Sequence, residues 1–137
     1  MISIQELYGQ VNELAKKINA PVELLPTFGT SDLSGRPYIV IQGDTYHYLA
    51  NDRDTVVVNR ETTSLPKLLY WIFDYITGQM GSKYEKEHRI PDVDPRRTAF
   101  RKQLELLDAL YPHWKEQRQQ EIQVLLEKHP YRDELKR

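Results

Sequence analysis

Residues 68–111 constrain the fold of this chain more than any other segment. They begin with a broad apolar helix pattern over residues 68–76, pass through a dense run of charged side chains, and return to an apolar helix pattern after Asp94-Pro95. Trp71 widens the first apolar stripe, and Phe73 lies within it. A helix that is apolar over so much of its circumference is typical of a buried position. We therefore expect the first helix of this pair to be the central one.

Charged residues separate those two helices. The cluster that requires an explanation comprises Tyr84, Glu85, Arg89, Asp94, Arg96 and Arg97. Arg96 and Arg97 fall just inside a predicted helix start, where a cation opposes the helix dipole at roughly 0.3–1 kcal/mol each. Because local helix stability does not account for them, they need carboxylate partners elsewhere. We expect an intramolecular charge network, with Glu85 and Asp94 as the first partners of the two arginines.

Two other interpretations of this cluster stay open. Arg96, Arg97 and Arg101 could form a nucleic-acid-binding face, which a basic patch free of carboxylates would favour. An enzyme site around Glu85 and Asp94 would be favoured by a deep pocket lined with those carboxylates. The chain has no histidine pair at metal-ligand spacing, no serine nucleophile motif and no glycine-rich phosphate loop. Catalysis, a metal site and a cofactor are therefore not predicted.

The N-terminal half predicts a helix followed by a small sheet. Ser3 and Glu6 form a capping-box signature, and apolar residues then recur at helical spacing to residue 18. Residues 21–36 have the proline, glycine and polar content of a connector. The strand candidates are residues 37–42, 45–49 and 55–59, and Gly43-Asp44 fits a two-residue hairpin turn. We predict a three-stranded antiparallel meander over residues 37–60.

Helix signals dominate the remainder of the chain. A cap at residues 62–64 precedes the central helix, and Pro112 opens a last helix that ends at His129-Pro130. Between them, Asp94-Pro95 begins a helix whose apolar stripe consists of Phe100, Leu104, Leu107 and Leu110. The predicted fold is a single α+β domain over residues 1–137, with an N-terminal helix, the meander, and three or more packed helices. If Phe73 is fully buried, replacing it with alanine should destabilise the protein by about 3–5 kcal/mol.

Composition limits the class of protein. The 137 residues are 39% hydrophobic and 28% charged, as in globular chains, and contain no cysteine. No apolar run approaches the roughly 20 residues that cross a bilayer, and no signal peptide is visible. A cytoplasmic location is the prediction that follows. The net charge of −1 gives no general argument for a nucleic-acid partner.

Aromatic and acidic side chains come together in and after the predicted hairpin. The residues that we predict to contact a protein partner are Tyr46, Tyr48, Asp52, Asp54 and Glu61. Tyrosine is enriched at interfaces, and the carboxylates could meet a basic partner. For Tyr46 and Tyr48, core packing stays an equally open alternative.

Several of these motifs together resemble those of the immunity protein 63 family of bacterial polymorphic toxin systems. The resemblance rests on residues 69–73 (LYWIF), then Tyr84-Glu85 with Arg89, then Asp94, Arg96, Arg97 and Phe100. It implies a cytoplasmic antitoxin that binds and neutralises a toxin domain, without catalysis. The motif residues would then serve mainly as scaffold. The missing motifs and the composition separately predict no cofactor, no membrane and no nucleic acid. The toxin's chemistry and the oligomeric state stay open.

Overall fold

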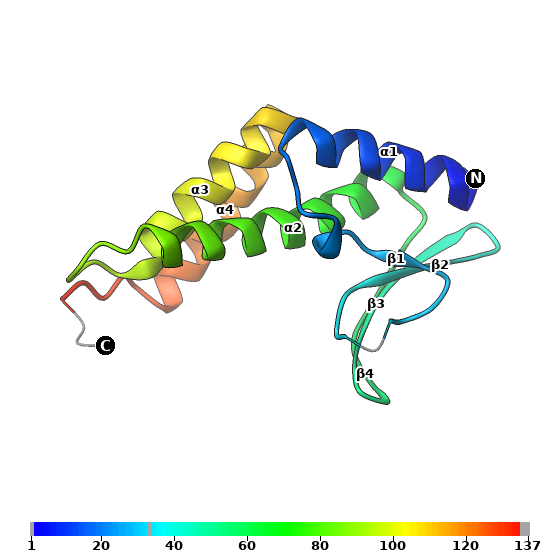
Figure 1. Ribbon diagram of the computed structural model, residues 1–137, viewed down its shortest axis with the longest axis horizontal. Coiled ribbons are helices and arrows are strands. Elements are labelled where there is room, and N and C mark those ends of the chain that lie inside the picture. Colours follow the sequence, from blue (N-terminus) through cyan, green and yellow to red (C-terminus); the bar gives the residue numbers. More distant parts are fainter. Residues whose placement is uncertain (1, 33, 135–137) are drawn as a thin grey trace. The chain divides into compact units, whose positions relative to one another are not determined.

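Four α-helices and a four-stranded sheet make up the part of the chain that the computed structural model describes, residues 2–32 and 34–134 (Figure 1). The α+β class predicted from the sequence is confirmed. The chain divides into two compact units, residues 1–72 and 73–137, and each is described by itself. Within the described ranges, no helix is long and apolar enough to cross a membrane.

The first unit contains the sheet and the N-terminal helix. Its elements are α1 (Ile4–Lys17), the short 3₁₀ helix η1 (Val22–Leu24), β1 (Thr27–Phe28), β2 (Tyr38–Gln42), β3 (Thr45–Asp52), β4 (Thr55–Thr62) and the beginning of α2 (Leu65–Glu87). The capping box of α1 is present as predicted. Ser3 Oγ accepts from the backbone N–H of Glu6 at 3.1 Å, and Glu6 Oε1 accepts from that of Ser3 at 3.3 Å.

Strands β2, β3 and β4 form the predicted antiparallel meander. Gln42 pairs with Thr45 across the first turn, and Asp52 pairs with Thr55 across the second. Gly43 occupies the first position of its turn with φ +62°, a conformation that glycine adopts without strain. Side chains along β3 alternate between buried and partly exposed, so one face of this strand belongs to the core.

A fourth strand, β1, was not predicted. It pairs in parallel with β2, with Thr27 beside Tyr38 and Phe28 beside Ile39, so the sheet is mixed rather than antiparallel. The sequence predicted a connector here because two residues are too few for an alternation pattern and turn-forming residues flank them. The Phe28 ring meets that of Tyr8 from α1 edge-on, with centroids 5.4 Å apart.

The second unit is helical. It contains the rest of α2, then α3 (Pro95–Leu110) and α4 (Pro112–Lys128), which begin at the predicted prolines. Phe73 is fully buried and stacks on Trp114 with ring centroids 5.9 Å apart. Other buried apolar residues of this unit are Ile76, Leu107, Leu110 and Ile122. Because residues 68, 72, 73 and 76 are at most 1% exposed, the prediction that α2 is deeply buried is confirmed.

Helices α2 and α3 approach closely at Gly81. A β-carbon added there would lie 2.5 Å from the carbonyl oxygen of Ala99, closer than real β-carbons come to backbone atoms. Nearby, Gln103 Nε2 donates to the carbonyl oxygen of Asp74 at 3.0 Å, and Gln103 Oε1 accepts from Arg118 Nε at 3.1 Å. A glycine and a buried amide thus help to fix how α2, α3 and α4 pack, a feature that apolar periodicity does not predict.

Candidate partner-binding surfaces

The β3–β4 hairpin carries the acidic residues predicted to contact a partner. Asp52 ends β3, Asp54 lies in the turn, and Glu61 lies near the end of β4; all three are exposed. Glu61 lies 3.7 Å from His47 Nδ1. Neither Asp52 nor Asp54 has an ion-pair partner within residues 2–32 and 34–134. The carboxylates at the tip are therefore available to a partner.

Tyr46 and Tyr48 do not lie on that exposed surface. They are 3% and 6% exposed, because both point to the buried face of β3. The Tyr48 ring lies 6.2 Å from that of Trp71, and the Arg60 guanidinium covers Trp71 at 4.0 Å. Residues two apart on a strand share a face, so both tyrosines are buried together. The structure favours core packing, the alternative that the sequence left open for them.

Exposed apolar area on this hairpin comes instead from β4. Val56 and Val57 are 48% and 59% exposed, and β4 is an edge strand, paired with β3. Sequence reasoning identified these valines only as strand formers. The unbroken run of residues 55–58, TVVV, gives no signal of this exposure, because a run without alternation is typical of a strand buried on both faces. We call residues 52–61 the acidic hairpin, after its three exposed acids; the segment also contains Arg53 and Arg60.

Asp94 is the centre of the charge cluster in the second unit. Its carboxylate caps α3 by accepting from the backbone N–H of Arg96 at 2.9 Å, and it also accepts from the Arg96 guanidinium at 2.9 Å. The backbone N–H of Arg132 donates to the same carboxylate at 2.8 Å. The hydrogen bonds from Arg96 hold the pKa of Asp94 far below its ordinary value, although burial acts in the opposite direction.

The C-terminal segment completes this cluster. Arg96 donates to the carbonyl oxygens of His129 and Pro130 at 2.8 and 2.7 Å. Asp133 accepts from Arg97 Nε and Nη2, each at 3.0 Å. The Arg97 guanidinium also lies over the Tyr131 ring, 4.1 Å from its centroid. These contacts join the C-terminal segment to the start of α3. We name as the clasp the five residues Asp94, Arg96, Arg97, Tyr131 and Asp133.

The clasp explains why two arginines occupy an unfavourable helix position. Arg96 pairs with Asp94, one of the two partners expected from the sequence. Arg97 also pairs with a carboxylate of the same chain, as expected, but this partner is Asp133, at 3.0 Å, rather than Glu85 or Asp94. Asp133 is 36 positions away in the chain, and this separation hides the pair from local sequence reasoning.

Glu85 belongs to a separate ion pair at the end of α2. It accepts from Arg89 Nε and Nη2 at 2.9 and 2.7 Å, one helical turn away. These hydrogen bonds are the main reason that the pKa of the Arg89 guanidinium is raised. Tyr84 stacks on His88 with ring centroids 4.1 Å apart, and the Lys102 ammonium lies 4.9 Å from the Tyr84 centroid. The residues predicted as one network are thus divided between these contacts and the clasp.

Neither alternative interpretation of the cluster gains support from these contacts. Arg96 and Arg97 each lie against a carboxylate, so they do not form the carboxylate-free basic patch expected of a nucleic-acid site. Asp94 lines a surface hollow beside Pro95 and His129, and a carboxylate with a strongly lowered pKa is a poor general acid or base. Among the described residues, no three His, Asp or Glu side chains are grouped to hold a metal ion.

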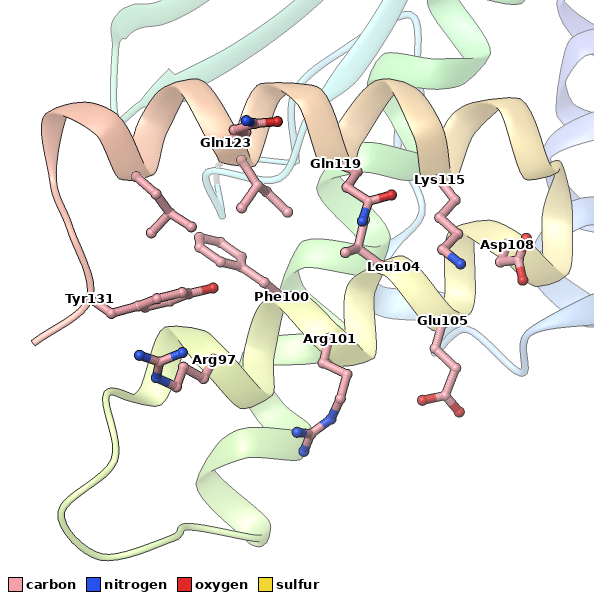
Figure 2. Close-up of a pocket in the computed structure, with 12 residues that line it drawn as sticks. Arg97, Phe100, Arg101, Leu104, Glu105, Asp108, Lys115, Gln119, Gln123 and Tyr131 are labelled. Atoms are coloured by element: carbon pink, nitrogen blue, oxygen red, sulfur yellow. The ribbon is translucent and has the colours of Figure 1, made fainter. Parts of the chain in front are cut away.

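A groove of about 600 Å³ runs between α3 and α4 (Figure 2). Its apolar lining comes from both helices and consists of Phe100, Leu104, Ile122 and Leu126. The Tyr131 ring of the clasp lies at one end. Charged side chains of α3 border the groove, namely Arg97, Arg101, Glu105 and Asp108. The groove was not predicted, because Phe100 and Leu104 were expected to share the buried stripe of Leu107, whereas they are only half-buried.

Comparison with known protein families finds a match over the middle of the chain. The family model described as Immunity protein 63 matches residues 43–124, more than half of the chain. The matched region includes the acidic hairpin, the start of α3 and most of the residues that line the groove. No curated protein and no solved structure matches the chain.

Proposed function

Because this chain belongs to the Immunity protein 63 family and so has an immunity function, we propose that it binds a cognate bacterial toxin domain and neutralises it stoichiometrically. Family membership is the observation that carries this proposal. The proposed mechanism is binding alone, without catalysis, cofactor or nucleic acid. Asp94, Arg96 and Arg97, which could have belonged to an enzyme or nucleic-acid site, form ion pairs within the chain instead. The proposed place of the encounter is the cytoplasm, where a delivered toxin would act.

The proposed contact surface is the acidic hairpin. Asp52 and Asp54 are exposed and without ion-pair partners among the residues described, so their charge can steer a basic toxin face during association. Glu61 extends the acidic side of this surface. Val56 and Val57 supply the exposed apolar area that the desolvated centre of an interface requires. Tyr46 and Tyr48 would support the hairpin from its buried face, in place of the direct contact first expected.

Co-expression and co-purification test the function itself. Cells that produce the cognate toxin domain should survive when this chain is co-expressed, and the purified pair should elute together. Survival without a complex would indicate a mechanism other than stoichiometric binding. A toxin that stays fully active with an excess of this chain would contradict the proposed function.

Charge reversal tests the surface separately. The double variant Asp52→Lys/Asp54→Lys should associate more slowly with the toxin, and its association rate should depend less on salt. The matched control is Glu13→Lys/Glu127→Lys, which reverses two exposed acids on α1 and α4. If both double variants associate at the wild-type rate, the toxin binds elsewhere. If both are slowed equally, net charge rather than the hairpin controls association.

A further inference from the structure

The α3–α4 groove leaves apolar surface open on two helices of the second unit. Of the apolar residues that line it, Phe100, Leu104 and Leu126 are half-buried and Ile122 is buried. A helical hairpin with an open apolar seam is half of a four-helix bundle, in which a second hairpin covers the seam. Tyr131, which the clasp holds through Arg97, gives one end of the groove a fixed wall.

Charge along α3 changes sign midway through the helix. Arg97 and Arg101 lie in its first half, and Glu105 and Asp108 lie in its second half, at spacings of three and four residues that keep them on one face. Arg101 and Asp108 have no ion-pair partner in residues 2–32 and 34–134. The Glu105 side chain is 68% exposed, and its ion pair with Lys102 is long, at 3.8 Å.

These charged groups are placed to reach another molecule. Arg101 and Glu105 are one turn apart, but Figure 2 shows both side chains pointing away from α4 with their charged ends apart. Arg97 directs Nε and Nη2 toward Asp133, which leaves part of its five-donor fork for another carboxylate. The α3 side of the groove thus presents positive charge at one end and negative charge at the other, and Lys115 of α4 lines the groove near the acidic end (Figure 2).

Such a face is complementary to itself when it is reversed. If a second copy of α3 lies antiparallel over the full helix, Pro95–Leu110, then Arg97 comes opposite Asp108 of the copy. In the same register Arg101 lies one position from Glu105 of the copy. A parallel arrangement would instead bring Arg101 against Arg101. Reversal by a two-fold axis is the symmetry of most protein dimers.

We propose that the α3–α4 groove is an interface between two copies of this chain, which pack α3 against α3 in antiparallel orientation and complete a four-helix bundle with both α4 helices. The occupant is a second copy because the charge order of α3 matches its own reverse. This inference goes beyond the proposed function and does not rest on it, because it requires no toxin.

Sedimentation and light scattering of the full chain at several concentrations test the interface. The wild type should show the mass of two chains. Arg101→Glu and Glu105→Arg should each raise the dimer dissociation constant by about tenfold or more. In a two-fold symmetric dimer the Arg101–Glu105 contact occurs twice, and each substitution makes both copies of it repulsive. The control Lys83→Glu reverses an exposed charge of α2 outside the groove and should leave the mass unchanged. Far-UV circular dichroism verifies that each variant is folded.

Mixing the two single variants gives the sharpest result. Each alone repels its own kind, but the acidic face of Arg101→Glu is complementary to the basic face of Glu105→Arg, so an equimolar mixture should form a mixed dimer. The double variant Arg101→Glu/Glu105→Arg should also regain the wild-type mass, because the pairs are exchanged rather than removed. A wild type that stays monomeric at every concentration would overturn the proposal. So would a dimer that Arg101→Glu leaves intact, because the contact would then lie elsewhere.

Discussion

The acidic hairpin and the clasp are both rich in charge, but they use it differently. In the clasp, Asp94 is matched by Arg96 and Asp133 by Arg97, and backbone N–H groups satisfy the same carboxylates. In the hairpin, Asp52 has no ion-pair partner in the described part of the chain, and exposed valines lie near it on β4. Density of charge in a sequence therefore does not mark a binding surface. What matters is whether the charge is already matched by the same chain.

This difference assigns separate consequences to the two regions. Changes in the clasp should alter the free energy of unfolding, because they leave a partner group unmatched in the folded state. Changes in the hairpin should alter association with a partner and leave the free energy of unfolding as it is. Variants in and around each region therefore test whether the clasp controls stability and the hairpin controls association.

Among the variants that compare the two regions, Asp94→Ala should have the greatest effect on stability. The side chain is 4% exposed, caps α3 and pairs with Arg96, so its loss should destabilise the protein by about 2–4 kcal/mol. Urea unfolding followed by circular dichroism measures this. Asp94→Asn, which keeps a capping oxygen but loses the charge, should fall between the wild type and Asp94→Ala. If Asp94→Ala unfolded at the same urea concentration as the wild type, the clasp would not contribute to stability, and its distinction from the hairpin would be lost.

Gly81→Ala should be the next most harmful change. The new methyl group would meet the Ala99 carbonyl oxygen, and such overpacking costs about 1–3 kcal/mol, more than the helix propensity of alanine restores. The matched control is Gly9→Ala in α1, where no atom lies within 4 Å of the added carbon. That control should stabilise the protein slightly. If both variants melted above the wild type, the close approach of α2 and α3 would be refuted.

Acidification should weaken the clasp. The pKa values of Asp94 and Asp133 are lowered in the folded state, mainly by hydrogen bonds from Arg96 and Arg97 respectively. Their stabilising contribution is therefore fully present above the unfolded-state pKa of about 4, and it is lost as the pH falls through the lower folded-state values. Unfolding free energies of the wild type and of Asp94→Asn should converge as the pH falls below about 4. Parallel curves over that range would show that Asp94 titrates normally.

Asp52→Lys/Asp54→Lys should leave stability almost unchanged. Both carboxylates are exposed and contribute no ion pair among the described residues, so the melting temperature of the double variant should equal that of the wild type. Differential scanning calorimetry measures it. A clear loss of stability would mean that these acids are matched in the folded chain, as those of the clasp are.

Local patterns in the sequence predicted the elements that depend on near neighbours. The Ser3–Glu6 capping box, the Gly43-Asp44 turn and the Asp94–Arg96 pair all join residues at most three positions apart. Contacts that depend on the folded chain were not accessible. Arg97 finds Asp133 only after α3 and α4 have packed and returned the C-terminal segment to the start of α3.

The same limit applies to the surfaces. Alternation along residues 45–50 groups Tyr46 with Tyr48, but it does not say which face is covered, and the two tyrosines were first considered for the exposed one. The groove likewise depends on how α4 lies against α3, since Phe100 and Leu107 have the same apolar character in the sequence. Two-residue β1 carries no pattern that could predict its pairing with β2.

Titration of the toxin domain's activity with three forms of this chain would separate the two uses of charge. The forms are the wild type, the hairpin variant Asp52→Lys/Asp54→Lys, and the clasp variant Arg97→Ala. We expect the wild type and Arg97→Ala to abolish activity at one molar equivalent, whereas the hairpin variant needs an excess. Loss of activity well below one equivalent would contradict stoichiometric binding. Equal inhibition by the wild type and the hairpin variant, with loss of inhibition only in Arg97→Ala, would reverse the roles assigned to the hairpin and the clasp.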